Sequence, residues 1–113
     1  MIKSASGQGA TLTEMYAHFN KLHFGGQLAT YTVRQDLTGK DGVMGTCIPS
    51  ERLISLNENL VGGELIGELL HEMIHVAVGH HGVAFAREVE RLIRAGETSL
   101  DTDAHRRAAF SLS

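Results

Sequence analysis

The stretch from residue 64 to residue 78 constrains the fold most strongly, because its apolar residues recur with the period of an α-helix. At about 100° per residue, the apolar side chains cover roughly half of a helical cylinder: Leu65, Ile66, Leu69, Leu70, Met73, Ile74, Val76 and Ala77. The polar side chains share one narrow strip: Glu64, Glu68, His71, Glu72 and His75. That strip has no Lys or Arg, unlike the solvated face of a surface helix. The pattern predicts a core helix with a single functional strip.

The sequence His71-Glu72-Met73-Ile74-His75 on this strip has the pattern of a zinc-protease active site. Histidines four positions apart lie on the same face of a helix, so both imidazoles can reach one metal ion. Glu72 directly follows the first histidine and points to the place of a zinc-bound water, which makes it the candidate general base. We therefore predict that His71 and His75 are metal ligands and that Glu72 is catalytic. Buried structural histidines beside a solvated glutamate are the alternative.

A catalytic zinc site needs three protein ligands and one open position. His81 lies six residues after His75, a spacing that a tight chain reversal after the helix permits. We therefore predict one Zn²⁺ per chain, held by His71, His75 and His81. His80 and Cys47 are the alternative third ligands.

Other polar residues have less defined roles. Glu68 and Glu64 lie on the metal face, one and two turns before His71, and either could accept a hydrogen bond from a ligand imidazole. Ordinary, partly exposed carboxylates are the alternative for both. The remaining histidines, His18, His23 and His105, have no metal-ligand spacing to any visible partner, and we predict surface or packing positions for them. Phe85 is predicted to be a core anchor.

Composition limits the classes of function. A chain of 113 residues is long enough for one domain with a core. A net charge of −3 gives no strong basic patch and no electrostatic reason for tight, autonomous binding to nucleic acid. The single cysteine excludes an internal disulfide and indicates a reducing compartment. The first ten residues do not resemble a signal peptide, and no apolar run is long enough to span a membrane. We therefore expect a cytoplasmic protein with no membrane partner.

The order of the predicted elements is that of an α+β protein with a small, three-stranded sheet. An N-terminal helix begins at about Thr11, which forms a capping box with Glu14, and ends at Phe24 before two glycines. The other predicted elements are strands at 29–35, 43–48 and 52–56, a turn at 36–42, the motif helix at 64–78 and a C-terminal helix at 83–95. We predict a single domain over 1–113 with its core at about 11–96. Residues 1–10 and 97–113 are expected to be flexible or peripheral, with a short helix as an alternative for the second segment.

Three segments together resemble the SprT-like (Spartan-related) zinc metalloprotease domain family. The first is Phe19-Asn20-Lys21-Leu22-His23-Phe24-Gly25-Gly26-Gln27-Leu28, and the second is Arg52-Leu53-Ile54-Ser55-Leu56. The third is Leu69-Leu70-His71-Glu72-Met73-Ile74-His75, followed by Gly79-His80-His81-Gly82-Val83-Ala84-Phe85. The resemblance covers about residues 12–95. It implies a zincin-like minimal metalloprotease fold and, in cellular members, a link to proteins crosslinked to DNA.

The sequence departs from the family in three respects. The insert between His75 and His81 is very short, the Cys-based zinc ribbon of some members is missing, and so are the basic tails of larger members. The function that we predict is a zinc-dependent endopeptidase that hydrolyses peptide bonds through a metal-activated water. Its predicted partners are protein or peptide substrates, among them DNA-associated proteins, with DNA as a candidate recruiting partner.

Two other classes of function stay open from the sequence. A metal-dependent endoribonuclease family uses the ligand pattern H-x-x-x-H-x-x-x-x-x-H, which has the spacing of His71, His75 and His81. Its residue after the first histidine is not Glu, so Glu72 favours the peptidase. The second alternative is a non-catalytic zinc-binding module.

Overall fold

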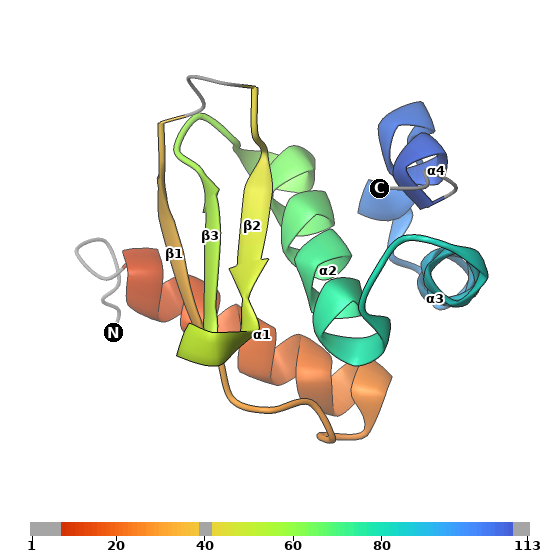
Figure 1. Ribbon diagram of the computed structural model, residues 1–113, viewed down its shortest axis with the longest axis horizontal. Helices are drawn as coiled ribbons and strands as arrows, with labels where there is room; N and C mark the ends of the chain where they lie inside the picture. Colours follow the sequence, from red (N-terminus) through yellow and green to blue (C-terminus); the bar gives the residue numbers. More distant parts are fainter. Residues whose placement is uncertain (1–7, 39–41, 110–113) are drawn as a thin grey trace. The chain divides into compact units, whose positions relative to one another are not determined.

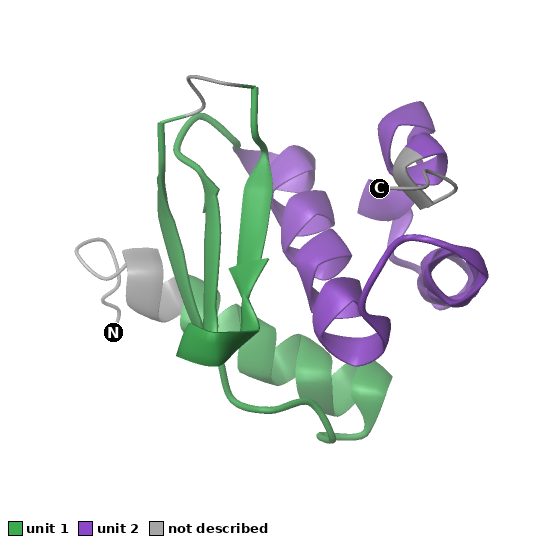
Figure 2. Ribbon diagram, viewed as in Figure 1, with its two compact units in different colours: residues 1–60 green, residues 61–113 purple. Residues whose placement is uncertain are grey.

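The computed structural model describes residues 8–38 and 42–109 of the chain, with side chains described for residues 12–38 and 42–107. Figure 1 shows the elements, and Figure 2 shows the two compact units that they form, residues 1–60 and 61–113. The first unit contains α1 (Gln8–Phe24), β1 (Thr32–Leu37), β2 (Gly45–Ile48), the 3-10 turn η2 (Pro49–Glu51) and β3 (Leu53–Asn57). The second unit contains α2 (Gly62–Val78), α3 (Val83–Arg94), the 3-10 turn η3 (Thr98–Leu100) and α4 (Asp103–Ala109). The predicted α+β class is confirmed.

The sheet of the first unit is mixed, and β3 lies in its centre (Figure 1). β1 pairs with β3 in parallel, and β2 pairs with β3 antiparallel. The helix α1 packs against β1. Its buried side chains Leu12, Tyr16 and Phe19 recur at helical spacing, and the strands contribute the buried Val33, Ile54 and Leu56. This apolar core explains why a short, three-stranded sheet is stable here.

The predicted start of the first helix is wrong, although its predicted end is confirmed. α1 begins at Gln8, so Thr11 lies inside the helix and cannot be its N-cap. The helix ends at Phe24, and Gly25 and Gly26 follow with φ of 62° and 73°. The amide of Gly26 donates to the carbonyl of Asn20 at 2.9 Å, which satisfies a free carbonyl of the last turn.

The first strand begins three residues later than predicted, at Thr32 instead of residue 29. Side chains of α1 hold the segment before it. The hydroxyl of Tyr16 donates to the carbonyl of Ala29 at 2.6 Å, and the side-chain amide of Asn20 donates to the carbonyl of Leu28 at 3.0 Å. These carbonyls are therefore used by the helix rather than by a strand ladder. The other two predicted strands are present with shifts of one or two residues, at 45–48 and 53–57. Residues 39–41 of the predicted turn lie outside the described residues.

The motif helix is present as predicted. α2 runs from Gly62 to Val78, and its side chains Leu69, Leu70, Met73 and Ile74 are fully buried. It ends at Gly79, whose φ of 85° is in the region that favours glycine. This reversal turns the chain towards α3, which begins at Val83 and buries Phe85, Val89 and Leu92.

The segment after residue 96 contains a short helix, the alternative that the sequence left open for it. Residues 98–100 form η3, Leu100 is fully buried, and α4 follows. Gly67 of α2 permits this packing, because a Cβ there would lie 2.6 Å from the backbone oxygen of Ser99. The rest of the prediction for the termini falls on residues 1–7 and 110–113, outside the described residues.

The single-domain assignment stays a prediction. No helix in the described ranges is both long and apolar enough to cross a membrane.

Candidate metal centre

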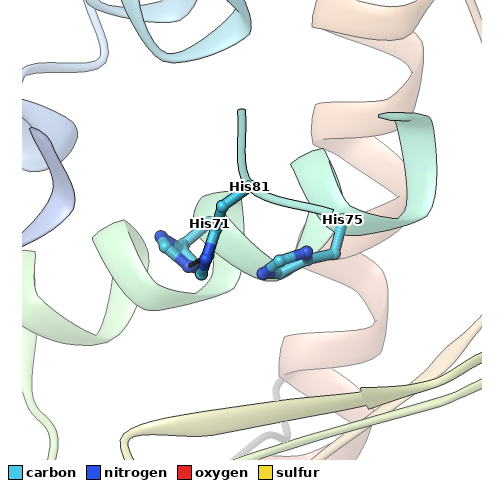
Figure 3. Close-up of side chains that lie close together, drawn as sticks. All are labelled: His71, His75 and His81. Atoms are coloured by element: carbon cyan, nitrogen blue, oxygen red, sulfur yellow. Dashed lines mark hydrogen bonds between the residues drawn. The ribbon is translucent and has the colours of Figure 1, made fainter. Parts of the chain in front are cut away.

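Three histidines of the second unit converge at the C-terminal half of α2. His71 and His75 lie one turn apart on α2, with ring centroids separated by 5.1 Å. His81 follows the reversal at Gly79, and its Nε2 lies 3.3 Å from Nε2 of His71. Figure 3 shows the three imidazoles gathered on the same side of the helix. One ligand atom from each residue lies within 4.8 Å of the other two. The structure thus brings together the three predicted ligands.

The separation of one pair of these nitrogens matches that of two ligands on a tetrahedral zinc ion. Two nitrogen ligands at 2.0–2.1 Å from such an ion are about 3.3 Å apart. The Nε2 atoms of His71 and His81 have this separation. Three neutral imidazoles suit zinc and other late transition metals, whereas magnesium and calcium prefer oxygen ligands.

The proton of His75 is fixed by a backbone carbonyl. Its Nδ1 lies 2.6 Å from the carbonyl oxygen of Gly79, which can only accept a hydrogen bond. Nδ1 must therefore carry the proton, and Nε2 keeps a lone pair for a metal. The same glycine that ends α2 thus also selects the tautomer of His75.

The electrostatics of the site lower the pKa of His71 and of His81. His71 is buried, and burial together with the nearby His105, His75 and His81 lowers its pKa to about 3. Burial also lowers the pKa of His81, with His75 and His80 as further causes. A metal ligand must be an unprotonated imidazole, so both shifts favour ion binding near neutral pH. Phe85, fully buried as predicted, forms the apolar side of the site, with ring centroids 4.8–4.9 Å from those of all three ligands.

Two carboxyl groups lie beside the histidines. Glu72 is only 4% exposed, and burial with the neighbouring Glu68 raises its pKa to about 9. Burial also raises the pKa of Glu68, whose carboxyl accepts a hydrogen bond from the protonated carboxyl of Glu72. One oxygen from each, with one nitrogen of His71, forms a second group within 4.8 Å. The predicted general base is therefore next to the first predicted ligand.

Of the two other carboxylates predicted at the site, Glu68 belongs to a group of potential metal ligands in the described ranges and Glu64 does not. Glu68 contacts Glu72, and the ring nitrogens of His71 lie near those of His105 and His81, so the role of Glu68 as an acceptor for a ligand imidazole stays a prediction. Glu64 is exposed and joins neither group of potential ligands among the described residues. His80 is also exposed and outside both groups, as is the half-exposed Cys47 of β2 in the first unit.

His105, predicted to be a surface or packing residue, contacts the predicted ligand His71, and no pattern in the sequence predicts this contact. Nδ1 of His105, on α4, lies 3.1 Å from Nδ1 of His71. The two residues are 34 positions apart, so neither helical nor motif spacing could relate them. Only its residue type hinted at a function, because His105 is a histidine in a segment that could form a short helix.

A comparison with protein families agrees with this geometry. The model of the SprT-like family matches residues 12–105, a range that includes all of the histidines and carboxylates described above. No curated protein matches the chain. No solved structure matches it either.

Proposed function

The chain belongs to the SprT-like family, and from this premise we propose that it is a zinc-dependent endopeptidase. The observation that carries the proposal is the convergence of His71, His75 and His81 beside the buried carboxyl of Glu72. A metalloprotease-type domain needs this combination of three neutral ligands and one base. The proposed substrate is a protein or peptide.

We propose zinc as the ion, held by His71, His75 and His81. The spacing of 3.3 Å between two Nε2 atoms and the fixed tautomer of His75 both support this choice. When bound, the zinc would lower the pKa of a water molecule and polarise the carbonyl of the peptide.

Glu72 is the proposed general base. In the metal-free protein burial keeps its carboxyl protonated, whereas a cation held by the adjacent imidazoles favours the carboxylate. The carboxylate would then accept a proton from the attacking water and deliver it to the amine that leaves. Its hydrogen bond with Glu68 holds the carboxyl in place, so Glu68 orients the base in this proposal.

The position of Glu72 also bears on the alternatives. An endoribonuclease with the same histidine spacing does not require a glutamate here, and a non-catalytic zinc-binding module does not require one in a buried position. Both therefore leave the burial of the Glu72 carboxyl beside the three histidines unexplained. The role of DNA as a recruiting partner stays a prediction.

The test is an incubation of zinc-loaded protein with an unfolded protein and, separately, with single-stranded RNA. Glu72→Gln, which keeps the shape of the side chain, is the control. The wild type should cleave the protein but not the RNA, and the variant should bind one zinc per chain and cleave neither. Cleavage of RNA alone would replace the peptidase by the endoribonuclease. If the wild type cleaves neither substrate, with or without single-stranded DNA, the zinc-binding module is the better description.

A further inference from the structure

We propose that His105 is a positioning residue for the metal site, because it fixes the orientation and the tautomer of the ligand His71. The inference rests on the proposed function, since it concerns how a proposed ligand is presented. Its basis is the contact between the two Nδ1 atoms at 3.1 Å. Ligand histidines in metalloproteins commonly donate their second N–H to another group of the protein.

The two contacts of His71 permit one productive arrangement of protons. Its Nε2 faces His81, so that nitrogen must keep a lone pair to bind an ion. The proton of the neutral ring is then on Nδ1, which donates to Nδ1 of His105. His105 accepts with its own lone pair and carries its proton on Nε2. The reverse donation would place the proton of His71 on Nε2 and would block the ligand.

The fold holds His105 at this position through contacts that do not involve the metal site. The amide of His105 donates to Oγ1 of Thr102 at 3.2 Å in the first turn of α4. Arg106, its neighbour, forms ion pairs with Asp101 at 2.8 Å and with Glu90 of α3. Leu100 is fully buried just before α4. The imidazole is therefore carried by an anchored segment.

Gly67 provides the space for this approach on the side of α2. A Cβ at position 67 would lie 3.1 Å from Nε2 of His105 and 2.6 Å from the backbone oxygen of Ser99. Because Gly67 lies one turn before His71, the missing side chain lets the segment from η3 to α4 lie directly against the ligand.

The two helical ligands thus have different partners. His75 donates to a carbonyl, which can only accept, and its tautomer needs no further control. His71 faces an imidazole, which is able to donate or to accept. Without His105, the buried Nδ1–H of His71 would lose its acceptor, and the ring could rotate or change tautomer.

The experiment compares four variants with the wild type, each first prepared without metal. His105→Phe keeps an aromatic ring but has no acceptor, His105→Ala removes the ring, and His105→Asn restores a polar group near the position of Nδ1. His18→Ala removes an exposed histidine of α1 as a matched control. The measurements are the affinity for Zn²⁺ in competition with a chelating indicator, the visible spectrum of bound Co²⁺, and the thermal unfolding of each metal-free protein.

We expect His105→Phe and His105→Ala to lose about 10–100-fold in zinc affinity, with a changed Co²⁺ spectrum. His105→Asn should recover most of the affinity, and His18→Ala should match the wild type. Equal affinities of His105→Phe and wild type, at similar metal-free stability, would overturn the inference. So would an equal loss in His105→Asn and His105→Phe, because the ring alone would then matter. A wild type that binds zinc but cleaves no protein would contradict only the proposed peptidase, whereas one that binds no zinc would contradict both.

Discussion

At the scale of single residues, the identity of the third ligand depends on two adjacent histidines. His81 has an Nε2 atom 3.3 Å from His71, whereas His80 is exposed and outside the groups of potential ligands in the described part of the chain. We expect His81→Ala to lose zinc at concentrations that saturate the wild type, because two ligands hold the ion much less tightly than three. His80→Ala, the matched control, should bind one zinc per chain. Elemental analysis after gel filtration measures both, and the opposite result would move the third ligand to His80.

The buried carboxyl of Glu72 should make the metal-free protein less stable as the pH rises. Its pKa is about 9 in the folded protein and near 4.5 in an unfolded chain, so the folded protein keeps a proton that the unfolded chain loses. This contribution is complete below pH 4.5 and is lost as the pH rises towards 9. His71, with a lowered pKa of about 3, acts with the opposite sign, but only below its ordinary value of 6.5.

Between pH 7 and pH 9 the carboxyl therefore dominates, with a slope of at most about 1.4 kcal/mol per pH unit. Urea unfolding of the metal-free protein at several pH values measures this slope. Glu72→Gln, which has no proton to lose, should flatten the slope, and Glu64→Gln, a change at an exposed position, should not. A wild type with constant stability over this range would show that Glu72 is ionised without metal.

At the scale of elements, Gly67 links the packing of the C-terminal segment to the metal site. Gly67→Ala should displace η3 and α4, because the new Cβ would meet a backbone oxygen at 2.6 Å and His105 at 3.1 Å. We expect a loss of about 1–3 kcal/mol in the free energy of unfolding, together with weaker zinc binding although every ligand is intact.

Gly63→Ala is the matched control on the same helix. Its Cβ would lie 3.6 Å from Oγ of Ser99, an ordinary contact, so the change should stabilise α2 by up to about 1 kcal/mol. Denaturant unfolding and zinc titration of the two variants test the link. Equal zinc affinity in both variants would show that the site does not depend on the packing of η3 and α4.

The elements also show where sequence patterns stop being informative. Helical periodicity predicted α2 and the proximity of His71 and His75, because these depend only on the 3.6-residue repeat. The start of β1 was missed, since Tyr16, thirteen positions away, binds the carbonyl of Ala29. His105 was missed for the same reason, because its contact with His71 depends on tertiary packing at Gly67. Local spacing thus predicts the candidate ligands, and the partner of His75 is also local, whereas the partner of His71 comes from a distant part of the chain.

At the scale of the whole molecule, the two compact units differ in the probes that they carry for a test of cooperative unfolding. Each has about the length below which single cores become marginal, so we expect one cooperative transition. The chain offers separate probes for the two units. Both tyrosines, Tyr16 and Tyr31, belong to the first unit and there is no tryptophan, whereas the proposed zinc ligands all belong to the second unit.

Zinc at 100 times its dissociation constant should stabilise the folded protein by about 2.7 kcal/mol, which raises the unfolding temperature of a chain of this length by about 10 °C. If the units unfold together, the tyrosine signal shifts by this full amount and coincides with the release of zinc. Tyrosine fluorescence and a zinc indicator, followed in one thermal scan with and without chelator, measure both. A ligand stabilises only the cooperative unit that contains its site. If zinc does not change the temperature of the tyrosine transition, residues 1–60 therefore unfold on their own.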